Sequence, residues 1–171
     1  LEQRHLRMVV EPIEEQFRET YADPDRLSQV FSNILLNAVK FTPDGGAITV
    51  RSRGLPGFVE ITIADTGIGI ALEDQERIFE KFASLGDASL HSTGKTKFKG
   101  GGAGLGLSIA RGIVAAHGGT IWAESPGYDE QALPGSTFHV LLPLRSQPPD
   151  VKEPELLQWA KDPRPWRRLR S

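Results

Sequence analysis

The chain has 171 residues, of which 39% are hydrophobic and 25% are charged, and it contains no cysteine. This length supports one hydrophobic core of ordinary size, and the lack of cysteine excludes disulfide bonds, thiolate zinc sites and thiol nucleophiles. The net charge of −2 argues against a dedicated nucleic-acid binder, and no apolar run reaches the 18 residues of a membrane-spanning helix.

The first quarter of the chain predicts strands followed by one clear helix. Residues 5–10 carry β-branched side chains and predict a strand, and residues 17–21 predict a second, short one. Asp23 can cap the next helix and Pro24 suits its first position. Its apolar residues follow helical spacing and form one stripe: Leu27, Val30, Phe31, Ile34, Leu35, Ala38 and Phe41.

The remaining core mixes predicted strands and helices. Strands are expected over residues 47–52, 58–64, 120–124 and 137–144, and helices over residues 73–82 and 104–117. Residues 83–101 form a polar stretch with glycines, and a loop of that length in a compact domain is usually functional. We expect an α+β sandwich in which about three helices cover one face of a mixed, mostly antiparallel sheet.

The C-terminal residues differ in composition from the rest. Residues 1–144 hold 13 Lys/Arg and 18 Asp/Glu, whereas residues 145–171 hold 7 and 4 and carry five of the 12 prolines. We therefore place a domain boundary near Leu144 and expect residues 145–171 to form a Pro-rich basic tail, with a short helix over residues 155–161. Two interpretations of the tail stay open: a frayed end, or a docking segment that leads to a further domain.

A polar stripe on the first helix is a candidate site. Asn33, Asn37 and Lys40 follow i, i+4, i+7 spacing and border the buried face. Amide oxygens can ligate a hard cation, and an ammonium group can neutralise phosphate. The alternative is a solvated polar flank without a site.

A second candidate follows the strand expected over residues 58–64. Asp65 is followed by Gly67 and Gly69, which places a carboxylate acceptor beside exposed backbone. The exocyclic amine of a purine would suit that acceptor. The alternative is an ordinary strand-to-helix turn.

Glycine is concentrated in a third candidate, where seven glycines fall between positions 86 and 106. Residues 100–106 lead into a predicted helix, so their N–H groups and the positive helix end can face an anion. The alternative is a flexible hinge. A P-loop is excluded because Ser89 stands where its first glycine is needed, and a Rossmann GxGxxG motif because Leu107 replaces the third glycine.

Five segments come in one order along the chain: residues 33–43, 65–70, 78–82, 102–107 and 135–138. They resemble the N, G1, F, G2 and G3 boxes of the catalytic and ATP-binding domain of bacterial sensor histidine kinases. The resemblance covers residues 1–144 and implies the Bergerat (GHKL) ATP-binding fold, with ATP and Mg²⁺ as cofactors.

The resemblance also implies roles for particular residues. Asp65 would accept a hydrogen bond from the adenine amino group, Asn37 would ligate Mg²⁺, and residues 83–101 would form a mobile lid hinged by Phe79 and Phe82. Asn33 and Lys40 would face the phosphates, and the backbone of residues 102–106 would line the triphosphate. The full implied site is Asn33, Asn37, Lys40, Phe41, Asp65, Gly67, Gly69, Ile78, Gly102, Gly104, Leu105, Gly106, Leu107 and Thr137.

Two departures from the family pattern concern the lid and the phosphoacceptor. Ala83 and Ser84 replace the usual aromatic and arginine, and Lys95, Lys97 and Lys99 are candidates to supply the missing charge. His5 lies in a strand-like run and is a poor phosphoacceptor. The resemblance therefore implies transfer to a histidine on a separate dimerisation domain of the same parent protein, and from there to a response regulator receiver domain.

The remaining expectations are a monomeric cytoplasmic domain of a homodimeric parent, whose membrane anchoring stays open. Two alternative functions are kept. One is another protein of the same fold, such as a serine kinase for a regulator or an ATPase. The other is a non-catalytic nucleotide-binding scaffold.

Overall fold

The computed structural model describes residues 4–12, 20–80, 105–147 and 167–169. The strands are β1 (Arg7–Val10), β2 (Thr20–Ala22), β3 (Ala47–Leu55), β4 (Phe58–Asp65), β5 (Thr120–Glu124), β6 (Ser136–Pro143) and β7 (Arg167–Leu169). The helices are α1 (Pro24–Phe41) and α2 (Gly106–Ala116), with the 3-10 turns η3 (Leu72–Asp74) and η4 (Arg77–Phe79) between β4 and α2. Among the described residues, no helix is long and apolar enough to cross a membrane.

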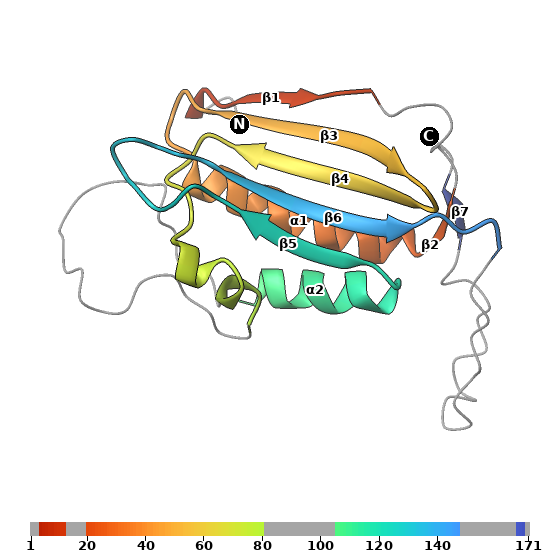
Figure 1. The fold of residues 1–171 in the computed structure, drawn as a ribbon. Coiled ribbons are helices and arrows are strands. Elements are labelled where there is room, and N and C mark those ends of the chain that lie inside the picture. Colours follow the sequence, from red (N-terminus) through yellow and green to blue (C-terminus); the bar gives the residue numbers. More distant parts are fainter. Residues whose placement is uncertain (1–3, 13–19, 81–104, 148–166, 170–171) are drawn as a thin grey trace.

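Five strands form one sheet in the order β1-β3-β4-β6-β5. β1 runs parallel to β3, and every other neighbouring pair is antiparallel. Helices α1 and α2 lie on the same face of this sheet (Figure 1). The expected α+β sandwich with a mixed, mostly antiparallel sheet is confirmed.

The sequence signals for α1 are confirmed by its geometry. The Asp23 Oδ1 atom accepts hydrogen bonds from the backbone N–H groups of Asp25 and Arg26, both at 3.1 Å, and Pro24 takes the first helical position. The buried part of the apolar stripe is Leu27, Val30, Ile34 and Ala38. Because Ile34 and Ala38 are among them, the C-terminal half of α1 is packed into the core.

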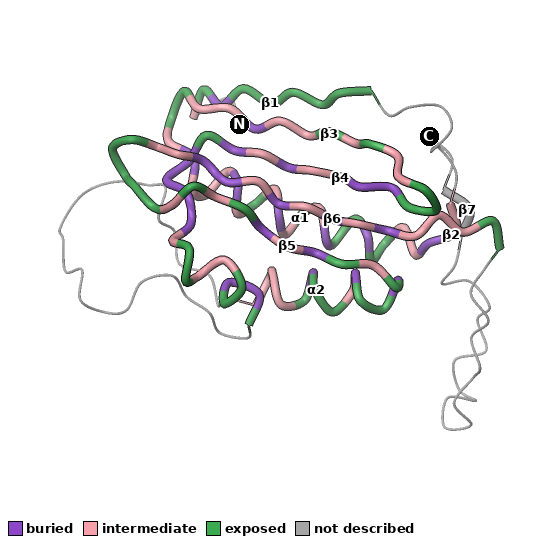
Figure 2. Tube along the Cα trace, in the orientation of Figure 1, coloured by how far each residue is buried: buried purple, intermediate pink, exposed green. Residues whose placement is uncertain are grey.

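The core lies between the helices and the central strands. Ile63 on β4 and Phe138 and Val140 on β6 are buried together with Val114 on α2. Figure 2 shows buried residues along β4 and β6, whereas β1 is exposed along its whole length. β4 and β6 therefore supply the sheet's central contribution to the core.

The single helix expected over residues 73–82 is wrong for the described part of that range. Residues 72–79 form the separate turns η3 and η4, and neither has a side-chain cap. The local sequence offers no apolar stripe, because the buried residues Ile78 and Phe79 are adjacent rather than one turn apart. Within the described residues, these turns take the place of the third helix.

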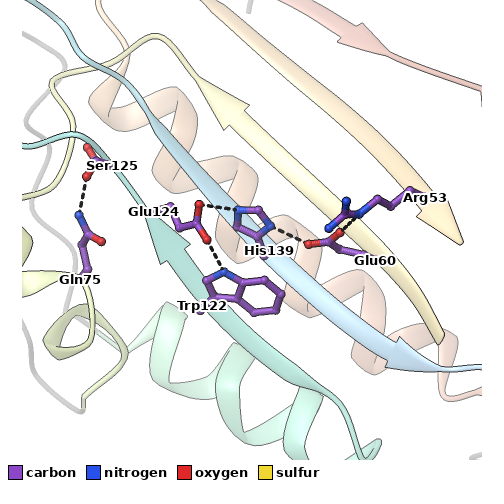
Figure 3. Close-up of polar contacts among 7 residues, drawn as sticks. All are labelled: Arg53, Glu60, Gln75, Trp122, Glu124, Ser125 and His139. Carbon is purple, nitrogen blue, oxygen red and sulfur yellow. Dashed lines mark hydrogen bonds and ion pairs between the residues drawn. The ribbon is translucent and has the colours of Figure 1, made fainter. Parts of the chain in front are cut away.

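Charged and aromatic side chains cross-link the helix-free face of the sheet (Figure 3). Glu60 on β4 forms an ion pair with Arg53 on β3 and accepts a hydrogen bond from His139 Nδ1 on β6 at 2.8 Å. Burial raises the pKa of Glu60, but the hydrogen bonds from His139 and Arg53 outweigh burial and leave the pKa below its ordinary value. The Trp122 ring on β5 stacks on His139 with centroids 4.6 Å apart, so four strands are joined from this side.

A second, two-stranded sheet lies where α1 begins. β2 pairs antiparallel with β7, with Thr20 opposite Leu169, and Arg145 donates its backbone N–H to Thr20 Oγ1 at 2.9 Å. The strand expected over residues 17–21 is observed at Thr20–Ala22, and residues 13–19 lie outside the described part. The helix expected over residues 155–161 also lies outside it.

A chain that ends at Gln147 lacks β7. We expect its free energy of unfolding to be about 1 kcal/mol lower, while its nucleotide affinity stays unchanged. A short strand pairing contributes on the order of one or two net hydrogen bonds, and β2 lies at the opposite end of α1 from the candidate site (Figure 1). Urea denaturation and ADP titration measure the two quantities. A changed affinity would contradict this expectation.

Candidate functional site

The elements that carry the described residues of the expected site meet at one end of the sandwich. The end of β4, the start of β6, the C-terminal half of α1 and the start of α2 all lie there (Figure 1). Gly102, Gly104 and the expected lid at residues 83–101, including Ala83, Ser84 and the three lysines, lie outside the described residues.

Asp65 is a buried carboxylate at the last position of β4, with 8% of its surface exposed. Its Oδ1 atom accepts from the Gly67 N–H at 2.8 Å and its Oδ2 atom accepts from the Ser136 hydroxyl at 2.5 Å. Burial raises the pKa of Asp65, and these two hydrogen bonds offset part of that effect. A carboxylate has about four acceptor positions, so this one keeps capacity for a ligand donor.

The loop after Asp65 is packed too closely for side chains at its two glycines. A Cβ atom on Gly67 would lie 2.4 Å from the backbone oxygen of Phe41 at the end of α1. Gly69 has a φ of +74°, and its Cβ would lie 2.0 Å from the backbone oxygen of Gly127. Glycine is therefore required here by backbone conformation and by close approach.

Ser125 holds this loop from the opposite side. Its Oγ accepts from the Ile70 N–H at 3.0 Å and donates toward the Gly135 oxygen at 2.7 Å. Gln75 donates from Nε2 to the Ser125 backbone oxygen at 2.7 Å (Figure 3). The segment that follows β5 is thus bonded to both the Asp65 loop and the start of β6.

Replacing Ser125 with alanine should destabilise the domain by about 1–3 kcal/mol, because the Ile70 N–H and the Gly135 oxygen lose their partner in a half-buried place. Urea denaturation measures this cost. Alanine at the exposed Ser28 is the control and should change stability by less than about 0.5 kcal/mol. Equal effects at the two positions would contradict a bridging role for Ser125.

The polar stripe of α1 faces the start of α2. Asn33 donates from Nδ2 to the Gly106 backbone oxygen at 2.9 Å, and a Cβ on Gly106 would lie 3.4 Å from the Asn33 side chain. Asn37 and Lys40 continue this stripe and are half-buried. The Lys40 ammonium lies 4.9 Å from the centroid of the Phe41 ring. The structure thus brings Asn33 of the stripe into contact with the first residue of α2.

The apolar residues expected to wall a nucleotide base are buried or half-buried. Ile78 is buried, and its neighbour Phe79 packs edge-on against the Phe138 ring with centroids 6.3 Å apart. Leu107 lies half-buried against the core, and Leu105 occupies the N-cap position of α2.

The structure places Ser136, and not Thr137, beside Asp65. Asp65 pairs with Ser136 across β4 and β6, so the two side chains share the face that carries the helices. Thr137 pairs with Ala64 and Glu124, and strand alternation turns it to the helix-free face. Thr137 is therefore next to the site in sequence but on the other side of the sheet.

Further residues of the site were not among those expected from the sequence. Gly135 has a φ of +75°, and its Cβ would lie 2.4 Å from the Asp65 backbone oxygen. This glycine and Ser136 belong to the motif at residues 135–138, so strand pairing alone was missing to identify them. Ser125 and Gln75 were not identified from the sequence, because the contacts that tie them to the Asp65 loop and to each other join residues 50 or more positions apart.

Comparison with known proteins gives a family for most of the chain. A family model described as histidine kinase-, DNA gyrase B- and HSP90-like ATPase matches residues 22–146. The histidine protein kinase DivJ of Caulobacter vibrioides is 38% identical over 130 residues, which are 76% of this chain and 20% of DivJ. The chain spans between a fifth and a third of the length of the curated relatives that it matches.

Solved structures share the fold. Full-length ShkA in complex with AMPPNP matches with a TM-score of 0.65 and 27% identity, covering 85% of this chain and 27% of ShkA. The histidine kinase ThkA in complex with the response regulator protein TrrA matches with a TM-score of 0.62 and 27% identity, covering 84% of this chain and 35% of that one.

Proposed function

The chain belongs to the histidine kinase-, DNA gyrase B- and HSP90-like ATPase family, and we propose that it binds ATP with Mg²⁺ as the catalytic domain of a sensor histidine kinase. The observation that carries this proposal is the buried Asp65 carboxylate, held by Gly67 and Ser136 where α1, β4, β6 and α2 meet. The naming of DivJ as a histidine protein kinase and the AMPPNP complex of ShkA support it.

The adenine end of the proposed site is the Asp65 carboxylate and the loop that follows it. The carboxylate uses one acceptor position for Gly67 and one for Ser136, so it can accept from the exocyclic amine as well. That third hydrogen bond would compensate the burial that raises the pKa of Asp65. Gly67 and Gly69 shape this end of the site by letting the loop pack against the Phe41 and Gly127 backbones, and Ile78 and Leu107 supply apolar walls.

The phosphate end is the polar stripe of α1 together with the start of α2. Asn37 is the proposed Mg²⁺ ligand, and Lys40 and the N–H groups near Leu105 and Gly106 are the proposed contacts to the phosphates. The family resemblance adds Gly102 and Gly104, which lie outside the described residues. The described residues contain no group of three His, Asp or Glu side chains that could hold a metal. Mg²⁺ bound by one amide oxygen and the nucleotide phosphates fits such a site.

Phe41 and Asn33 support these groups from α1. Phe41 closes the end of the helix beside Gly67, and Asn33 fixes the first turn of α2 through the Gly106 oxygen. Bound Mg²⁺ would neutralise negative charge on the phosphates during transfer.

The proposed reaction is in-line transfer of the γ-phosphoryl group. The bond between the γ-phosphorus and its bridging oxygen to the β-phosphate breaks, and a bond to a histidine nitrogen forms, leaving ADP. The chain contributes positioning and charge neutralisation, and the accepting histidine belongs to a separate dimerisation domain of the parent protein. The complex of ThkA with TrrA supports a response regulator as the next acceptor.

The organisation of the chain is part of the proposal. The domain boundary near Leu144 is supported by the end of β6 at Pro143 and by the family match that ends at residue 146. We propose that the isolated chain is a monomer, since its dimerisation is assigned to the separate domain. A cytoplasmic location follows from the need for ATP and a response regulator.

Two measurements test this function. Calorimetric titration with ADP should show binding that strengthens when Mg²⁺ is added. Incubation with ATP and the separate histidine-bearing domain should then yield acid-labile phosphate on that domain. Phosphate released only to water would identify an ATPase, acid-stable phosphate on a regulator would identify a serine kinase, and binding without any turnover would leave a scaffold. Absence of ADP binding would overturn the site itself.

A further inference from the structure

Arg4 lies just before β1 and bonds to the end of α1. Its Nε donates to Asp44 Oδ1 at 2.8 Å, and its two terminal nitrogens donate to the backbone oxygens of Val39 at 2.6 Å and Thr42 at 2.7 Å. The side chain is 22% exposed, so these hydrogen bonds are largely shielded from water. The Arg4 backbone oxygen also accepts from the Gly45 N–H at 3.2 Å.

This arrangement suits the chemistry of a helix end. The last carbonyl groups of an α-helix lack partners within the helix and carry partial negative charge. A guanidinium group offers five N–H donors in a rigid plane and stays charged, so one side chain can satisfy two carbonyls and a carboxylate together. Arg4 therefore closes the C-terminal turn of α1 with a cation that comes from another part of the chain.

The same turn of α1 contacts the Asp65 loop directly. The Phe41 backbone oxygen accepts from the Ile68 N–H at 3.2 Å, and it lies 2.4 Å from where a Cβ on Gly67 would be. Lys40 belongs to this turn as well. Phe41 thus lies between the two residues, Val39 and Thr42, whose carbonyl groups Arg4 holds.

We propose that Arg4 is a positioning residue for nucleotide binding. It holds the last turn of α1 so that the Phe41 oxygen keeps the Asp65 loop in place and Lys40 stays directed at the phosphate end of the site. The proposal rests on the proposed nucleotide function and adds to it a residue outside every motif of the family resemblance. A shift of the segment that contains Arg4 would reach the site through these three hydrogen bonds.

The test compares Arg4→Ala with a matched control, Arg51→Ala. Arg51 also joins the segment around β1 to the rest of the domain, through an ion pair with Glu11 at 2.7 Å, but it lies in the middle of β3 away from α1. Titration with ADP and Mg²⁺ is carried out at a temperature where circular dichroism shows all variants fully folded. A merely stabilising role would not change the affinity of folded protein.

We expect the ADP dissociation constant to rise about tenfold in Arg4→Ala and to stay within about twofold of the wild type in Arg51→Ala. Arg4→Lys should fall between them, because one ammonium nitrogen keeps the charge but cannot reach three acceptors in a plane. Hydrogen exchange of the free protein gives a second measurement: the Ile68 amide should exchange faster in Arg4→Ala only.

Each result decides between the two proposals. If the wild type binds ADP and Arg4→Ala binds equally well, Arg4 has no positioning role while the proposed function stands. If Ile68 exchange is unchanged in Arg4→Ala, the route through Phe41 is wrong. If the wild type itself does not bind ADP, the proposed function fails first, and the role of Arg4 in it fails with it.

Discussion

Asparagine at position 65 should leave the fold intact and weaken ADP binding about 30-fold, which corresponds to about 2 kcal/mol, the size of one lost hydrogen bond in a desolvated site. The amide can keep both internal contacts: its oxygen accepts from the Gly67 N–H, and its NH₂ group donates to Ser136 Oγ. The second N–H of the amide then points where the adenine amine would donate. Calorimetric titration of the variant with ADP and Mg²⁺ measures the loss.

Stability gives an independent check on Asp65→Asn. Burial raises the pKa of Asp65 above its ordinary 3.8, although hydrogen bonds from Ser136 and Gly67 oppose this. A carboxyl whose pKa is higher in the folded state favours folding most below its unfolded-state pKa, and this contribution is lost as the pH rises through the folded-state pKa. The ionised carboxylate therefore costs stability at neutral pH, and the asparagine variant avoids that cost.

Urea denaturation of the wild type and of Asp65→Asn, from pH 7 down to about pH 4, measures how this loss of stability changes with pH. We expect Asp65→Asn to be at least as stable as the wild type at pH 7, with a difference that shrinks as the pH falls. A variant that loses both stability and affinity at pH 7 would mean that the carboxylate serves the fold rather than the ligand. An unchanged affinity would remove Asp65 from the adenine site.

Elements and candidate residues could be predicted from the sequence where the determining residues lie close together in the chain. Asp23, Pro24 and the apolar stripe predict α1 because a cap, a fixed φ and helical spacing all act within a few residues. The strand at Thr120–Glu124 is observed over the predicted residues. Asp65 and its glycines form a candidate site on their residue types and spacing alone, and the fold gives them a buried, hydrogen-bonded setting.

The features that could not be predicted depend on contacts between residues far apart in the chain. Thr137 and Ser136 are equally plausible neighbours of Asp65 in the motif, and only the pairing of Asp65 with Ser136 selects the serine. Arg4 meets the end of α1 from 35 or more residues away, and nothing around it in sequence indicates a contact. The helix expected over residues 73–82 is replaced by η3 and η4, and Gln75, which lies between these turns, bonds to Ser125, 50 residues away.

Among the described glycines, Gly69 should be the one whose substitution by alanine destabilises the domain most, with a loss of about 3 kcal/mol or more in the free energy of unfolding. Gly57→Ala is the matched control, since Gly57 has almost the same φ, +76° against +74°, but open space around it. Its cost should be that of the left-handed conformation alone, about 1 kcal/mol. Urea denaturation separates the two values.

The difference between these glycines tests how the site is built. Gly69 forms an isolated bridge with Tyr128, and the Asp129 N–H donates to the Ile68 oxygen at 2.8 Å, so the loop is clamped before any ligand arrives. A methyl group at Gly69 must push the Gly127 backbone away, and that movement also disturbs Ser125. Stability and ADP affinity should therefore fall together in Gly69→Ala.

Should Gly69→Ala fail to fold, Gly67→Ala is the substitute, because its methyl group meets the Phe41 oxygen and Asp65 Oδ1 without a left-handed backbone. Equal stability of Gly69→Ala and Gly57→Ala would show that the segment after β5 can move away from the added methyl group at little energetic cost. The loop would then take its shape from the nucleotide. A large difference would instead mean that the fold shapes the adenine pocket in advance, with the ordering cost already met by the contacts to Phe41, Ser125 and Gly127.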